Sequence, residues 1–238
     1  MADLKKELRK RRRPVEKVFN RFTEYWLTDA SFVILLFILI FTVFILPVLI
    51  EYGHVEMIFV NTVFLFLFFT GIFSSTSRFL ILLTSILFFT QLFLRILRIN
   101  DLNFDLYLLE LIVGVFNMLV FIMLNIRLLF RNSEVNLYRI FGAINVYLLL
   151  AVLGAFLFET FHIITGSSIS SIEKLQGTGE DYATYLYFSL VSLTTLGFGD
   201  IYPVHIMTKM LSVFLSTIGI LYPAVVIAKL VAEEKKGS

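Results

Sequence analysis

The stretch Thr194-Thr195-Leu196-Gly197-Phe198-Gly199-Asp200 lies between a short amphipathic segment and a long apolar one. Its two glycines flank an aromatic residue, and glycine adopts backbone dihedral angles that other L-residues rarely take. Successive carbonyl oxygens can therefore turn toward one axis, where an ion would meet oxygen atoms in place of water. A glycine-rich turn in an outer loop is the alternative interpretation.

The composition of the chain is that of a membrane protein. Hydrophobic residues make up 58% of the sequence, 27 residues are Phe, and the mean hydropathy is +0.89. A bilayer core of about 30 Å requires apolar runs of about 20 residues. We therefore expect an all-α membrane protein with six transmembrane helices. Their expected bounds are residues 30–50, 57–73, 79–97, 106–130, 137–158 and 206–231.

The segment YATYLYFSLVSL, residues 182–193, is too short to cross a bilayer but long enough for a re-entrant helix. The carboxyl end of a helix carries partial negative charge, which favours a cation nearby. Irregular backbone at membrane depth is tolerated only where protein buries it or where it lines water. The sequence therefore predicts a re-entrant pore helix and a filter loop between the fifth and sixth spans.

Residues 195–200 resemble the filter signature Thr-Val-Gly-Tyr-Gly-Asp of tetrameric potassium channels, in which carbonyl oxygens replace the hydration shell of the ion. The chain is similar to the six-span, voltage-gated-like members with one pore loop, of prokaryotic type. Leu196 replaces the usual Val, and Phe198 replaces the usual Tyr and lacks the hydroxyl that braces the filter. The resemblance implies passive, potassium-selective conduction through a homotetramer in which four loops surround one axis.

The same resemblance implies roles for individual residues. The carbonyl groups of the filter, with the Thr195 hydroxyl, are expected to bind K⁺, and the side chains at positions 196 and 198 to face the scaffold. These filter residues are Thr195, Leu196, Gly197, Phe198 and Gly199. Thr194 and Asp200 are expected to support the filter, with Tyr187 as the hydrogen-bond partner of Asp200. The alternative for Tyr187 is an interfacial aromatic residue.

The last span carries a candidate gate. Gly219 lies near its middle and Pro223 one turn later, and a helix kinks where proline removes a hydrogen bond. Bending at either residue would splay four such helices, so both are candidate hinges. The alternative is that glycine and proline are simply tolerated in membrane helices.

The four preceding spans predict a voltage-sensor-like domain without a working sensor. A sensor needs several charges inside the field, because one charge moving through 100 mV yields only about 2.3 kcal/mol. Residues 111–126 contain no basic residue, and Arg127 and Arg131 lie at the inner end of that span. Residues 57–73 and 79–94 contain no acidic partner. We expect weak voltage dependence or none.

The distribution of charge predicts the orientation. Lys and Arg are concentrated in residues 1–29, which places both termini in the cytoplasm, whereas Glu159 and other acidic residues populate the segment 159–204, expected outside. We expect a basic amino-terminal segment, a voltage-sensor-like domain, a pore domain and a cytoplasmic tail. Their bounds are residues 1–29, 30–130, 131–231 and 232–238. We expect the basic segment to bind anionic lipids, and the alternative is that it serves only as an orientation signal.

Arg95 and Arg98 depart from this charge distribution. They lie near the outer end of the third span, where the sequence predicts snorkelling or local pairing, with Glu110 as one candidate partner. Five amides inside the spans predict hydrogen bonds between helices. These amides are Asn61, Gln91, Asn117, Asn125 and Asn145.

Two further functions remain open at this point. The first is a nonselective cation channel, which is compatible with the residues found at Leu196 and Phe198. The second is a non-conducting membrane subunit in which the glycine loop is structural. No histidine cluster, cysteine pair, Ser-His-Asp set or nucleotide loop favours an enzyme. We expect no cofactor other than permeant K⁺, no nucleic acid partner, and a cell-membrane location.

Overall fold

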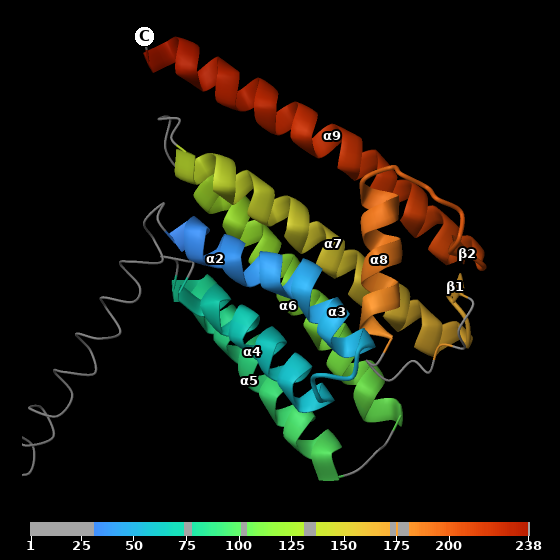
Figure 1. Ribbon diagram of the computed structural model, residues 1–238. Coiled ribbons are helices and arrows are strands. Elements are labelled where there is room, and N and C mark those ends of the chain that lie inside the picture. The colour runs from blue at the N-terminus through green and yellow to red at the C-terminus, as the bar shows by residue number, and fades with distance from the viewer. Residues whose placement is uncertain are drawn as a thin grey trace, which may run out of the picture.

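The computed structural model describes residues 31–73, 78–100, 104–130, 137–171, 175 and 181–237. Long helices lie side by side in a bundle, and one short helix, α8, runs across them (Figure 1). The basic segment 1–29, with its expected lipid-binding cluster, lies outside the described residues.

The described elements are helical apart from one pair of two-residue strands. In chain order they are α2 (Ser31–Ile40), η1 (Phe41–Ile45), α3 (Leu46–Glu51), α4 (Met57–Phe73), α5 (Arg78–Asn100), α6 (Phe104–Leu129), α7 (Leu137–Thr165), β1 (Ile169–Ser170), α8 (Tyr182–Leu193), β2 (Tyr202–Pro203) and α9 (Ile206–Gly237).

The first three elements follow one another without a break and form one apolar span, Ser31–Glu51. The π-helical turn η1 lies directly before Pro47, which is in the first turn of α3. Proline has no amide hydrogen for the bond to residue i−4, and a π turn is one way in which a helix accommodates that loss. The helix therefore continues past Pro47 with a local widening.

Among the described residues, five helices are long and apolar enough to cross a membrane. These spans are Ser31–Glu51, Phe79–Arg98, Leu106–Leu129, Leu137–Thr165 and Ile206–Lys229. The second expected span corresponds to α4, which has 17 residues and is about 25 Å long at 1.5 Å per residue. The protein is an all-helical, multi-pass membrane protein, and a sixth crossing by α4 stays a prediction.

The largest difference from the expected bounds is at the end of α7. This helix continues to Thr165 instead of ending at residue 158, so the placement of Glu159 in an outer loop was wrong. Glu159 is 2% exposed on the helix. A carboxylate is tolerated there because Tyr107 of α6 donates a hydrogen bond to it. The expected short helix, in contrast, coincides with α8.

Helix α8 packs between α7 and α9, and a glycine lies at each contact. A Cβ atom at Gly154 of α7 would lie 2.1 Å from Ser189 Oγ, and one at Gly219 of α9 would lie 1.6 Å from the carbonyl oxygen of Leu193. At Gly219 a larger residue requires movement of a helix, because the close atoms belong to the backbone, whereas at Gly154 the close atoms belong to side chains. On the far side of the loop, β1 and β2 pair antiparallel and join the two segments that flank α8.

The amides inside the spans have different partners. Asn145 Nδ2 of α7 donates to the carbonyl oxygen of Phe32 in α2 at 2.8 Å, which confirms an interhelical bond. Asn125 Nδ2 donates to Phe121 O within its own helix, so the prediction for Asn125 was wrong. Asn61 contributes its backbone oxygen, which accepts a bond from Arg95.

Candidate ion-conduction site

The loop after α8 has an alternating backbone conformation. Thr195, Gly197 and Gly199 have φ angles of +60°, +56° and +83°, whereas Leu196 and Phe198 between them do not have positive φ. Positive φ at every second residue takes the loop out of both regular helical and extended geometry. The glycine dihedral angles expected from the sequence are confirmed.

The amide groups at the start of this loop are bound to the end of α8. The N–H groups of Thr194, Thr195 and Leu196 donate to backbone oxygens of residues 190, 192 and 191 at 2.8, 3.1 and 3.1 Å. The Thr194 hydroxyl adds a second bond, 2.6 Å long, to Leu190 O. Within the described part of the chain, no hydrogen bond reaches the carbonyl oxygens of residues 195–199, which leaves their lone pairs for a cation.

Tyr187 of α8 donates a hydrogen bond from its hydroxyl to Asp200 Oδ2 at 2.6 Å. This is the pair expected from the sequence, and its role behind a filter stays a prediction. The bond from Tyr187 lowers the pKa of the Asp200 carboxyl, and the backbone N–H of Ile201 contributes in the same direction. The loop is therefore tied to α8 at both ends.

Two apolar side chains of the loop are left exposed by the part of the chain that the structure describes. Leu196 is 60% exposed and Phe198 is 67% exposed, although the sequence predicts that both face a scaffold. The described part of a single chain provides no such scaffold at this position. Among the described residues, both apolar side chains therefore stay largely uncovered.

The two candidate hinge residues lie within a continuous helix. Helix α9 runs from Ile206 to Gly237 through both Gly219 and Pro223. Gly219 directly contacts the last residue of α8, so close packing is a reason for glycine at this position that the sequence did not reveal. A hinge at Gly219 or Pro223 stays a prediction.

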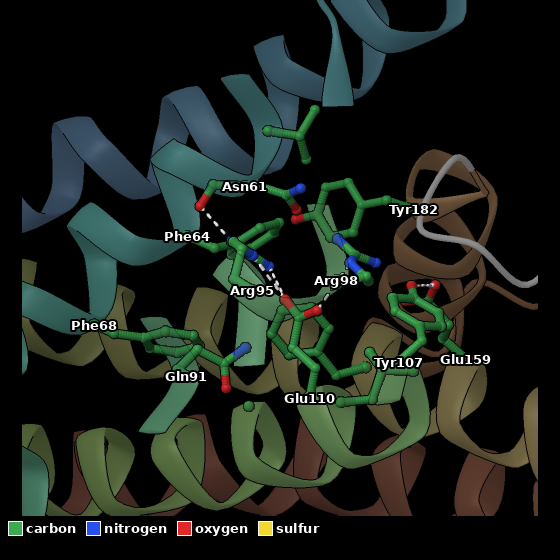
Figure 2. A pocket seen from close by; sticks show the side chains of 14 residues that line it. Asn61, Phe64, Phe68, Gln91, Arg95, Arg98, Tyr107, Glu110, Glu159 and Tyr182 are labelled. Atoms are coloured by element: carbon green, nitrogen blue, oxygen red, sulfur yellow. Dashed lines mark hydrogen bonds and ion pairs between the residues drawn. The ribbon is translucent and has the colours of Figure 1, made fainter. Parts of the chain in front are cut away.

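Away from the loop, a cluster of charged side chains lies between α5 and α6 (Figure 2). Arg95 Nε donates to Glu110 Oε1 at 2.7 Å, and its Nη1 donates to the backbone oxygen of Asn61 at 2.6 Å. Arg98 Nε lies 3.1 Å from Glu110 Oε2, and its guanidinium lies 4.7 Å from the centre of the Tyr107 ring. Local pairing of both arginines with Glu110 is therefore confirmed.

This charge cluster borders a small cavity between α4, α5 and α6 on one side and α7 and α8 on the other. The Tyr107 hydroxyl donates to Glu159 beside it, which joins α6 to α7 (Figure 2). The cavity volume is about 40 Å³, and one water molecule needs roughly 10–15 Å³ on this measure, so a few waters fit. The Oε1 atom of Gln91, a residue 4% exposed, lines the cavity and has no hydrogen-bond partner among the described residues.

A comparison with protein families agrees with the geometry of the loop. The model of a family described as ion channel matches residues 146–234. This part of the chain is similar to ion channels. The matched residues include α8, the loop 194–200 and most of α7 and α9. The match supports passive ion conduction by a multi-pass membrane protein. Searches of curated proteins and of solved structures gave no match.

Sequence reasoning singled out Gly219 only as a hinge and did not single out the other residues that hold α8 in place. Ser212, Ser216 and Gly219 are spaced by four and three residues on α9. Small residues at such spacing are typical of close contacts between membrane helices, so this signal could have identified the contact with α8. Tyr147 of α7, which also contacts α8, has no comparable signal in the sequence.

Proposed function

We propose that this protein is a potassium-selective channel of the cell membrane, in which residues 195–199 of four chains form the filter. The observation that carries this proposal is the alternating backbone of the loop, with its amides bound to α8 and its carbonyl oxygens free of hydrogen bonds in the described chain. Rings of such oxygens would replace the hydration shell of K⁺, and no other cofactor is needed.

A homotetramer accounts for the exposed parts of the single chain. Each chain contributes one loop, and a closed ring around an axis requires several copies. Only 17% of the α9 span is buried, and Leu196 and Phe198 are both exposed. In a tetramer, neighbouring subunits would cover these two side chains, and α9 would line the conduction path. The re-entrant role of α8 belongs to this proposal.

The four-helix unit, residues 30–130, would act as a static scaffold around the pore domain, residues 131–231. Arg95 and Arg98 are both paired with Glu110, and residues 111–126 of α6 carry no basic side chain. No charge is therefore placed to move through the field. With the basic segment 1–29 on the cytoplasmic side, both termini would be cytoplasmic, and α9 would open at its cytoplasmic end by bending at Pro223.

A flux assay on two glycine variants tests the proposed filter. Gly197 and Gly166 have φ angles of +56° and +77°, and a Cβ atom at either position would meet nothing within 4 Å. Alanine therefore imposes a similar strain, about 1–2 kcal/mol, at both positions. Gly197→Ala should abolish K⁺ efflux from vesicles that contain the protein, while Gly166→Ala should retain it.

The two variants also distinguish the potassium channel from the two alternative functions, a non-conducting subunit and a nonselective channel. Equal efflux from both variants would contradict the filter and favour a structural glycine loop. Loss of efflux in Gly197→Ala alone, with Na⁺ passing the wild-type protein as readily as K⁺, would favour the nonselective channel.

A further inference from the structure

The carboxyl end of α8 is held by hydroxyl groups from the helices on both sides. The Tyr147 hydroxyl of α7 donates to Leu193 O at 3.3 Å. The Ser216 hydroxyl of α9 has two acceptors for its one proton, Ser192 O at 2.8 Å and Ser212 O of its own helix at 3.0 Å, and the shorter distance is to Ser192 O. Ser192 Oγ lies 2.9 Å from Ser212 Oγ, which adds a second bond to α9. Helix α8 is therefore fixed at its end by side chains of two other helices.

All four terminal carbonyl groups of α8 have partners. The last four carbonyl groups of any helix lack partners within that helix. Those of residues 190, 191 and 192 accept bonds from the N–H groups at the start of the filter loop, and Leu193 O accepts the bond from Tyr147. Ser192 O accepts from Thr195 N and from Ser216 at the same time. The end of α8 and the first residues of the loop thus form one hydrogen-bonded unit.

Gly219 allows α9 to reach this unit. A Cβ atom at Gly219 would lie 1.6 Å from Leu193 O and 2.7 Å from Leu193 C, and Leu193 itself is 0% exposed. Both atoms belong to the backbone, so they cannot rotate away as a side chain would. A larger residue at position 219 has to displace the end of α8, and with it residues 194–196.

We propose that Tyr147, Ser216 and Gly219 are positioning residues that hold the end of α8 and thereby set the ion selectivity of the loop. This inference rests on the proposed function, because it assigns these residues to the same filter. A functional constellation needs its geometry held to within roughly 0.5 Å. The three residues supply that constraint without contact to the ion.

The test uses two mild variants and one matched control. Tyr147→Phe and Ser216→Ala each remove one hydroxyl that donates to the end of α8. Tyr222→Phe is the control, because the Tyr222 hydroxyl donates to Ala143 O at 3.0 Å and so joins α9 to α7 without touching α8. The full-length proteins are reconstituted in planar bilayers, and reversal potentials are measured with K⁺ on one side and Na⁺ on the other.

Tyr147→Phe and Ser216→Ala should raise the Na⁺ permeability relative to K⁺ by roughly twofold to tenfold, the range expected for the loss of one hydrogen bond. Tyr222→Phe should keep the wild-type ratio, and Ser216→Thr, which retains a hydroxyl, should restore it. Wild-type selectivity in both hydroxyl variants, from a wild-type protein that is itself selective, would overturn this inference alone. A wild-type protein without selectivity would overturn the proposed function and this inference together.

Gly219→Ala separates positioning from hinge bending. Positioning predicts a shift in the reversal potential, because the end of α8 has to move. A hinge alone predicts a changed open probability at an unchanged reversal potential, and that result would overturn the role given to Gly219. Gly114→Ala is the matched control on α6, because a Cβ atom there would lie at an ordinary 3.6 Å from its nearest neighbour, Gln91.

Discussion

At the residue scale, Thr195 is the strained residue of the loop. A β-branched residue at φ +60° is a true outlier, and such strain costs of the order of 1–3 kcal/mol. It persists only where the surroundings fix the backbone. The bonds from Thr194, Thr195 and Leu196 to the end of α8 provide this constraint. The strain is therefore consistent with a loop whose conformation is part of its function.

The pair Tyr187 and Asp200 gives a prediction for the pH dependence of the loop. The bond from Tyr187 lowers the pKa of Asp200 from its usual 3.8, so the charged carboxylate should persist as the pH falls through 3.8 and be lost only below it. In Tyr187→Phe the pKa should rise toward the usual value, so protonation should occur at higher pH. Carboxyl ¹³C shifts of labelled aspartate measure the titration directly.

Tyr202→Phe is the control for that titration. Tyr202 is 57% exposed and lies close to Asp200 in the chain, but the bond to Asp200 comes from Tyr187. The titration of Asp200 should therefore be the same in this variant as in the wild type. An Asp200 pKa that is equal in wild type and Tyr187→Phe would contradict the assigned partner.

The sequence predicted single residues where the residue type itself restricts the backbone conformation or the hydrogen-bond partner. The two glycines beside Phe198 indicated unusual dihedral angles at positions 197 and 199, and the resemblance to potassium channels implied the pairing of Asp200 with Tyr187. The positive φ of Thr195 could not be predicted, because threonine disfavours it locally and the bonds to α8 impose it.

At the scale of the elements, helix α8 was predictable and the end of α7 was not. Residues 182–193 were predicted as a helix because an apolar run of that length cannot cross a bilayer, and the helix has these bounds. Helix α7 continues beyond Glu159, whose buried carboxylate accepts a hydrogen bond from Tyr107, 52 residues away. Hydropathy along one segment contains no information about a partner on another helix.

The contact between α5 and α6 predicts a loss of stability in Glu110→Gln. This change removes the charge that pairs with Arg95 and Arg98, and leaves two partly buried guanidinium groups without their carboxylate. Breaking a buried ion pair by removal of one partner costs about 3–5 kcal/mol. Thermal unfolding in detergent should show a clearly lower midpoint.

Glu56→Gln is the matched control for this change, because Glu56 is exposed. The same substitution there should leave the unfolding midpoint close to that of the wild type, as exposed charges contribute little. Equal midpoints for Glu110→Gln and Glu56→Gln would show that the cluster between α5 and α6 is not a stabilising contact.

At the scale of the whole molecule, the helices before residue 131 meet α7 and α8 at several hydrogen bonds. Asn145 of α7 donates to the backbone of Phe32, and Tyr107 of α6 donates to Glu159. This last bond and the adjacent cavity join α4, α5 and α6 to α7 and α8. The sequence indicated the membrane class and the order of the helices, since both follow from local apolar length. The sequence did not indicate which faces of these helices meet, because the contacts between them depend on pairs of residues far apart in the chain.

The absence of charge within residues 111–126 predicts conduction that hardly depends on voltage. A single elementary charge that moved across 100 mV would yield about 2.3 kcal/mol and shift the open probability roughly 50-fold. We expect a change far smaller than this between negative and positive potentials in a planar bilayer. Steep activation by voltage would contradict the static scaffold.

A reversal potential tests whether residues 195–199 form a potassium filter. The purified wild-type protein is reconstituted in a planar bilayer under opposed K⁺ and Na⁺ gradients. We expect a reversal potential close to the potassium equilibrium potential. A reversal potential near zero would contradict the filter, because a loop that passes Na⁺ as readily as K⁺ does not replace the hydration shell of K⁺ selectively.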